Sequence, residues 1–127
     1  MGANAVLFQG RSGSGKSTLA LEMLARGAAL VADDRVWATL REGQIWLDPP
    51  EAIKGQIEAR GVGILSAKTC SHSRLALVVD MDQTETQRLP EMRQSEVAGL
   101  QVPLLHKVES AHFPASLVQY LKGERLA

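Results

Sequence analysis

The sequence predicts an α/β fold, and three observations near the start of the chain support this prediction. Ala5–Gln9 is a short apolar run that stops at a glycine, as a buried strand does before a tight turn. Ser17–Arg26 then shows helical periodicity, and Gly27 supplies a left-handed cap. Ala29–Ala32 is a second apolar run. The order strand, helix, strand is typical of α/β domains.

The middle of the chain predicts antiparallel pairing. Val36–Leu40 and Gln44–Leu47 flank a turn at Glu42–Gly43, so we expect a polar hairpin there. Ile57–Leu65 contains two glycines, Gly61 and Gly63, and we expect a strand-like segment with at least one irregular bend.

The second half supplies the predicted centre of the sheet and a closing helix. Leu75–Val79 is the most hydrophobic β-type run, which indicates a central strand. Gln83–Gly99 is polar and predicted to be irregular, and Val102–Val108 is predicted as an edge strand. Pro114 can open a helix that runs to Leu121. Its inward-facing residues would be Leu117, Val118 and Leu121.

Composition predicts a single globular domain over residues 1–127, with 45% apolar and 22% charged residues. Basic and acidic residues balance at 14 each, so no net charge draws nucleic acid or an anionic membrane. Cys70 is the only cysteine, which excludes an internal disulfide and indicates a reducing compartment. No apolar run is long enough to cross a bilayer, and no signal peptide is recognisable. We therefore expect a cytoplasmic protein.

One motif between the first strand and the first helix indicates chemistry. Residues 10–17 satisfy G-x-x-x-x-G-K-[ST] at every fixed position. Glycines let successive N–H groups turn inward around phosphate oxygens, the lysine reaches the β and γ phosphates, and the serine hydroxyl can bind Mg²⁺. A glycine-rich turn without a ligand is the alternative. The predicted nucleotide-binding residues are Gly10, Arg11, Ser12, Gly13, Ser14, Gly15, Lys16, Ser17 and Thr18.

The loop does not define the reaction, but the rest of the sequence narrows it. A Ras-type GTPase needs an Asn-Lys-x-Asp guanine-binding motif, whereas the only asparagine here is Asn4, ahead of the loop. The chain is too short for a large motor ATPase. A small kinase or a nucleotide-binding module remains.

Two apolar runs end in aspartate, and either could place a carboxylate beside the loop. Asp33 and Asp34 follow the second predicted strand, and Asp80 follows Leu77–Val79. Parallel strands end at the same edge of a sheet, where a carboxylate can hold a metal or accept a hydroxyl proton. The alternative for the Asp33–Asp34 pair is an acidic turn that starts the hairpin.

Glu58 and Arg60 form a third candidate group. Residues two apart in a strand point to the same face, so both could meet one phosphate–metal centre. A salt bridge on a solvent-facing edge is the alternative. Arg88 and Lys107 are isolated cations in polar segments and are expected to be solvated.

Taken in order, four segments resemble one known family. They are the loop at residues 10–17, Arg26–Gly27, Leu30–Val36 and Ile57–Ile64. Their order and spacing resemble the catalytic C-terminal domain of HPr kinase/phosphorylase in its short, single-domain form. The resemblance implies a P-loop domain with a mixed central sheet, similar to the core of phosphoenolpyruvate carboxykinase and commonly assembled into hexamers.

The resemblance also implies an activity and its residues. Family members use ATP and Mg²⁺ to phosphorylate a serine of HPr, a phosphocarrier protein of the sugar phosphotransferase system, and many reverse the reaction by phosphorolysis. By position, Lys16 would polarise the β and γ phosphates, and Ser17 and Glu58 would hold Mg²⁺. Asp34 would be the catalytic base with Asp33 beside it, and Arg88 would lie near the transferred phosphoryl group.

The sequence departs from the family pattern in three places. Leu105–Ser110 stands where full-length members have the Pro-x-x-x-Gly-Arg-Asn segment that phosphorolysis needs. Arg88 precedes Leu-Pro rather than Leu-Gly. The family also has a histidine on a strand farther ahead of the loop than the nine residues before Gly10 reach.

Two other functions remain open at this stage. A small-molecule P-loop kinase would need an arginine-rich lid, which the sequence lacks as a cluster. A non-catalytic nucleotide-sensing module would bind nucleotide without turnover, so an assay with Mg²⁺, ATP and a carrier protein would distinguish it from a kinase.

Overall fold

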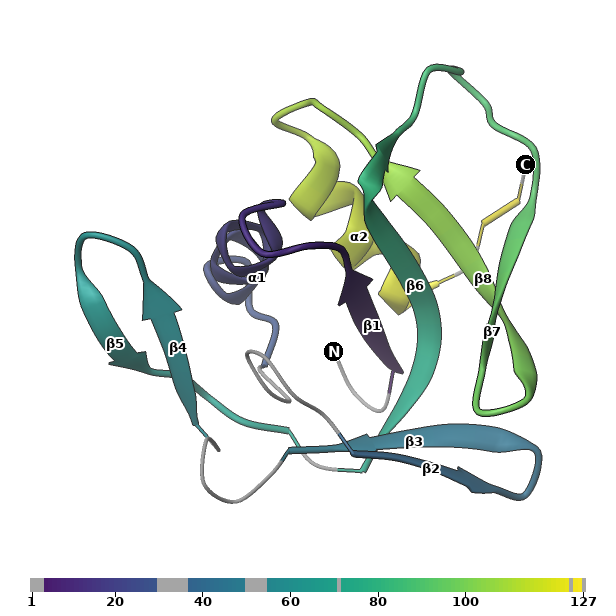
Figure 1. The fold of residues 1–127 in the computed structure, drawn as a ribbon, viewed down its shortest axis with the longest axis horizontal. Helices are drawn as coiled ribbons and strands as arrows, with labels where there is room; N and C mark the ends of the chain where they lie inside the picture. Colours follow the sequence, from purple (N-terminus) through teal and green to yellow (C-terminus); the bar gives the residue numbers. More distant parts are fainter. Residues whose placement is uncertain (1–3, 30–36, 50–54, 71, 124, 127) are drawn as a thin grey trace.

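The computed structural model describes residues 4–29, 37–49, 55–70, 72–123 and 125–126, and it confirms the α/β fold (Figure 1). Within these residues the main sheet has six strands: β1 (Asn4–Gln9), β2 (Trp37–Arg41), β3 (Gln44–Asp48), β6 (Ser73–Thr84), β7 (Arg93–Val97) and β8 (Leu100–Lys107). β4 (Gln56–Ala59) and β5 (Gly63–Ser66) form a separate hairpin. The helices are α1 (Lys16–Leu24) and α2 (Phe113–Lys122).

β6 organises the main sheet because three strands pair with it. β1 runs parallel to it along one edge. The opposite edge is shared: β3 pairs antiparallel at Ser73 and Arg74, and β8 pairs parallel from Val78 onward. Parallel and antiparallel pairs therefore coexist, as the predicted mixed sheet requires. The predicted central strand, Leu75–Val79, is confirmed inside a longer element.

A bulge in β6 distributes its apolar side chains to both faces of the sheet. Ala5 pairs with Leu75 but Val6 pairs with Leu77, so Ala76 is the extra residue. Leu77 and Val79 then face the helices, while Leu75 and Val78 face the other side. The helix-side core contains Leu19, Met23, Leu77, Val79, Met81, Phe113, Leu117, Val118 and Leu121. The other face contains Ala5, Ile45, Leu47, Leu75, Val78 and Val102.

Both helices form where the sequence predicts them. α1 begins one residue before the expected Ser17 and ends at Leu24, with Gly27 in the left-handed region at φ 92°. α2 has Pro114 in its first turn, and Leu117, Val118 and Leu121 are buried as expected. No helix in the described residues is long and apolar enough to span a membrane.

The structure corrects the predictions for three segments, Ile57–Leu65, Gln83–Gly99 and Val102–Val108. Ile57–Leu65 is not one bent strand but the β4–β5 hairpin, in which Val62 N donates to Ala59 O at 2.9 Å. The polar segment Gln83–Gly99 contains β7, and β7 rather than β8 lies at the edge of the sheet. The predicted strand Ala29–Ala32 lies outside the described residues beyond Ala29.

The β4–β5 hairpin extends away from the main sheet (Figure 1). Ile57 and Ala59 are buried on β4, which packs against α1, whereas Glu58 points to solvent between them. This alternation is the expected behaviour of a strand with one covered face.

Candidate nucleotide-binding site

The loop at residues 10–17 connects β1 to α1, as the motif requires (Figure 1). Gly13 and Gly15 have φ values of 84° and 99°, a region that side chains with a Cβ rarely adopt. Gly15 is also the N-cap residue of α1, and no side chain in the described part of the chain makes a capping hydrogen bond there. The N–H groups of the first turn and the positive end of the helix dipole are therefore available to an anion.

Glycine is also required at position 10, because neighbouring atoms approach its Cα too closely for a side chain. A Cβ atom at this position would lie 2.8 Å from Ser14 Oγ, 3.1 Å from Met81 Cβ and 3.3 Å from Asp82 Oδ1. Those contacts are shorter than real Cβ atoms tolerate without movement of their neighbours. The loop therefore curls against β6 in a way that only glycine permits at its first position.

Lys16 lies over the loop from the first turn of α1. Its Nζ donates a hydrogen bond to Gly10 O at 2.7 Å, so the lysine bridges the end of the loop to its start. Ser14 N donates to Arg11 O at 3.1 Å and tightens the turn between them. The side chain of Lys16 is half-buried, which keeps the ammonium near the loop rather than extended into solvent.

Ser14 supplies an independent sign that the loop accepts a ligand. Its Oγ is buried and has no hydrogen-bond partner among the described residues. Buried hydroxyls nearly always form a hydrogen bond, so a buried hydroxyl without one indicates a missing partner such as a ligand. A phosphate oxygen in the loop would accept a hydrogen bond from this hydroxyl, and the residues present thus fit a polyphosphate.

Two carboxylates of β6 lie beside the loop. Asp80 lies within β6 and pairs with Gln9, the last residue of the parallel strand β1 before the loop. Asp82 accepts hydrogen bonds from Arg11 N at 3.2 Å to each carboxylate oxygen. Asp82 N in turn donates to Asp80 Oδ1 at 2.9 Å. The structure thus brings Asp80, an expected candidate, to the loop together with Asp82.

Asp82 lies beyond the end of the apolar run Leu77–Val79, so the sequence pattern indicates Asp80 and not Asp82. The signal was nonetheless present, since Asp80 and Asp82 are two apart in a strand and alternate with the buried Met81. We infer that Asp82 stabilises the first turn of the loop by accepting the hydrogen bonds of Arg11 N.

We expect Asp82→Ala to loosen this turn. The substitution removes the acceptor for Arg11 N, so amide hydrogen exchange at Arg11 should accelerate, and affinity for ATP should fall about fivefold, as for a partly exposed charged hydrogen bond. NMR-detected exchange and calorimetry measure the two effects. Glu96→Ala, an exposed carboxylate on β7, is the control and should change neither. Unchanged exchange at Arg11 would contradict the assigned role.

The remaining predicted site residues are distributed as follows. Ser17 is half-buried and Thr18 exposed in the first turn of α1. Glu58 is exposed on β4, and Arg88 is exposed in the segment between β6 and β7. Asp33 and Asp34 lie outside the described residues. Among the residues that the structure does describe, no group of three or more His, Cys, Asp or Glu side chains could hold a metal ion.

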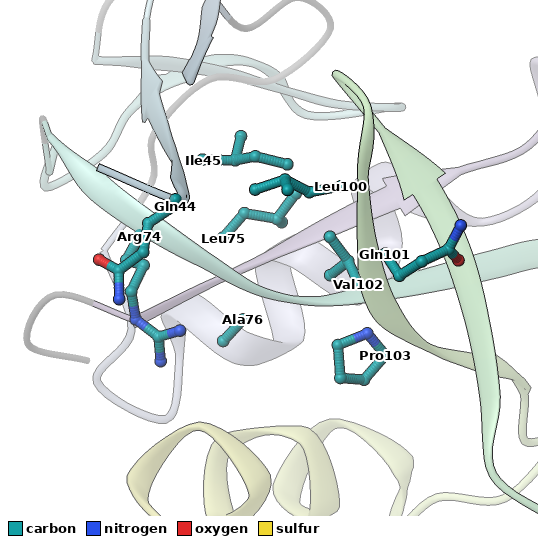
Figure 2. Close-up of a pocket in the computed structure, with 10 residues that line it drawn as sticks. Gln44, Ile45, Arg74, Leu75, Ala76, Leu100, Gln101, Val102 and Pro103 are labelled. Atoms are coloured by element: carbon teal, nitrogen blue, oxygen red, sulfur yellow. The ribbon is translucent and has the colours of Figure 1, made fainter. Parts of the chain in front are cut away.

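A pocket of about 200 Å³ lies elsewhere, where the edge of β6 is unpaired between β3 and β8 (Figure 2). β6 contributes Arg74, Leu75 and Ala76 to its lining, and Arg74 Nη2 donates to Asn4 Oδ1 at 2.8 Å. None of its lining residues belongs to the loop or to the predicted site. The pocket is therefore separate from the candidate nucleotide site.

Comparison with known proteins identifies relatives. Residues 2–114 match the family described as HPr Serine kinase C-terminal domain. The chain is 41% identical over 121 residues to the HPr kinase/phosphorylase of Aromatoleum aromaticum, covering 81% of this chain and 37% of that protein. The corresponding protein of Streptococcus sanguinis is 35% identical over 111 residues, with coverage of 77% and 36%. This chain thus spans little more than a third of these relatives.

A solved structure supports the fold. The Hpr(Ser) kinase/phosphatase from Coxiella burnetii superimposes with a TM-score of 0.75 at 21% sequence identity. The match covers 92% of this chain and 85% of that chain.

Proposed function

Because the chain belongs to the HPr serine kinase C-terminal domain family, we propose that it transfers the γ-phosphoryl group of ATP to a serine of HPr or an HPr-like phosphocarrier protein. The observation that carries this proposal is the loop at residues 10–17. It joins a strand to an uncapped helix, holds Lys16 against Gly10 and buries an unpaired hydroxyl at Ser14. These are the features that a polyphosphate needs.

In the proposed mechanism the loop binds and orients the nucleotide. Inward-facing N–H groups and the Ser14 hydroxyl hold phosphate oxygens, while Lys16 exchanges its bond with Gly10 O for the β and γ phosphates. Ser17 and Glu58 would hold Mg²⁺, which when bound supplies charge neutralisation to the phosphate oxygens. Arg88 would meet the charge that builds up on the transferred group.

The chemical step requires a base, for which we propose Asp34 with Asp33 beside it. Asp34 accepts the proton of the serine hydroxyl as that oxygen bonds to the γ-phosphorus. The bond between the γ-phosphorus and the bridging oxygen breaks, and ADP leaves with that electron pair. A serine hydroxyl is a weak nucleophile at neutral pH, which is why a positioned carboxylate matters.

Incubation of the purified chain with Mg·ATP and HPr, followed by mass-spectrometric mapping of the modified residue, tests the activity. We expect one phosphoserine on HPr and no transfer when the loop lysine is replaced. Tight ATP binding without any transfer to the carrier would instead favour a nucleotide-sensing module.

Glu58→Gln tests the proposed metal ligands. The amide keeps the shape of the side chain but is a poorer ligand for Mg²⁺, so we expect weaker ATP binding in the presence of Mg²⁺ by about tenfold and little change in its absence. Calorimetric titrations with and without Mg²⁺ give both values. Glu96→Gln, again on the exposed face of β7, should match the wild type in both titrations. Identical Mg²⁺ dependence in Glu58→Gln would return Glu58 to a surface role.

A further inference from the structure

The end of β8 brings a second lysine to the loop. Lys107 is the last residue of β8, and its Nζ lies 4.0 Å from the position that a Cβ on Gly15 would take. Met81 Cε lies 3.6 Å from the same point. The sequence predicted Lys107 as a solvated cation, but the structure half-buries it against the loop. That expectation was wrong because the pairing of β8 with β6 could not be foreseen.

The backbone of Lys107 is held by the end of β6 and the residue that follows it. Lys107 pairs with Thr84 across a register shift in β6, and Lys107 O accepts a hydrogen bond from Glu85 N at 2.8 Å. The neighbouring Glu85 carboxylate accepts from Arg93 Nη1 at 2.6 Å. The lysine therefore projects from a held strand end rather than from a free loop.

The nearby carboxylates are engaged with other groups. Burial raises the pKa of Glu85, but the N–H of Gln87, the Arg93 guanidinium and the N–H of Thr86 outweigh burial and leave that pKa below its ordinary value. Glu85 is thus ionised and paired with Arg93, as Asp82 is engaged with Arg11 N. Within the described ranges, no carboxylate oxygen lies within 4.0 Å of Lys107 Nζ.

A half-buried ammonium without a counter-ion is unfavourable unless an anion joins it. Gly15 has no side chain, so the space in front of Lys107 Nζ is left to a ligand held by the loop. We propose that Lys107 binds the polyphosphate chain of the bound nucleotide as a second cation, in addition to Lys16. This inference rests on the nucleotide site of the proposed function but not on transfer to HPr.

Calorimetric titration with inorganic tripolyphosphate and with ATP, both without Mg²⁺, tests the inference. Lys107→Gln removes the charge and leaves a polar side chain that is one atom shorter, so affinity for both ligands should fall about tenfold. Lys107→Arg should stay within about twofold of the wild type because the charge remains. Lys122→Gln, an exposed lysine at the end of α2, is the matched control and should bind as the wild type does.

An NMR titration of the unaltered protein keeps the test valid if Lys107→Gln fails to fold. The side-chain resonances of Lys107 should shift on addition of tripolyphosphate, and those of Lys122 should not. Wild-type affinity in Lys107→Gln would overturn the inference. Unchanged Lys107 chemical shifts in the wild type saturated with tripolyphosphate would also overturn it.

The outcome separates this inference from the proposed function. If Lys16→Ala loses affinity while Lys107→Gln does not, the loop binds the nucleotide and only the role of Lys107 is wrong. If both variants lose affinity but HPr is never phosphorylated, the role of Lys107 stands and the kinase proposal fails. Wild-type affinity in both variants would overturn both.

Discussion

Lys16→Ala should weaken ATP binding by about thirtyfold or more while leaving the fold intact. The lysine makes charge-assisted contacts of the kind that contribute roughly 2 kcal/mol each, and its loss also removes the 2.7 Å bond that joins α1 to Gly10 O. The side chain lies over the loop and belongs to neither core cluster, so thermal stability should change little.

Calorimetry with Mg·ATP measures the affinity, and a melting curve of the same sample checks the fold. Lys68→Ala removes an exposed lysine outside every element of the main sheet and serves as the control. Equal affinities of Lys16→Ala and the wild type would mean that the loop is a structural turn and would remove the basis of the kinase proposal.

The loop and both helices could be predicted from sequence because their signals are local. The spacing of glycine, lysine and serine at residues 10–17 dictates a tight turn between a strand and a helix whatever the rest of the fold does. Pro114 at the start of α2 and apolar residues at helical spacing after it are local in the same sense.

The β4–β5 hairpin and β7 could not be predicted in the same way. Gly61 and Gly63 both have positive φ, at 85° and 138°, and reverse the chain where a bend was expected. β7, with the sequence RQSEV, lacks the apolar alternation of a strand. It is a strand because β8 offers a paired edge, which depends on residues that lie later in the chain.

The same limit applies to the site. Asp82 and Lys107 reach the loop through the register of β6 with β1 and β8, and the register includes shifts at Ala76 and after Asp80. A sequence pattern shows which residues carry charge but not which strand ends meet. The residues of the loop were therefore predictable, whereas the residues that surround it needed the structure.

Asp34→Asn should abolish phosphoryl transfer while ATP still binds. Asp34 follows an apolar run that the sequence predicts as a strand on the loop side of the sheet, and the family resemblance assigns it the proton of the serine hydroxyl. The amide keeps the shape of the side chain and cannot accept that proton. General base catalysis contributes about a hundredfold or more, so we expect a loss of at least this size in the single-turnover rate.

Binding should separate from chemistry in this variant. The loop amides and Lys16 hold the nucleotide, so affinity for Mg·ATP should stay within a few fold of the wild type. Asp33→Asn is the comparison, and we expect it to reduce transfer as well, but with a larger effect on binding through the metal and its charge. Rapid-quench transfer from labelled ATP to HPr, with calorimetry on the same samples, gives both quantities.

A fully active Asp34→Asn variant would assign the base to another group, and the structure identifies where to look. Asp80 lies within β6, directly beside Gln9 at the end of β1, and its Oδ1 accepts a hydrogen bond from Asp82 N at 2.9 Å. If Asp34→Asn retained activity and Asp80→Asn lost it, the proton would pass to β6. The role of catalytic base that the family resemblance gives Asp34 would then be wrong, while the proposed nucleotide site at residues 10–17 would be unaffected.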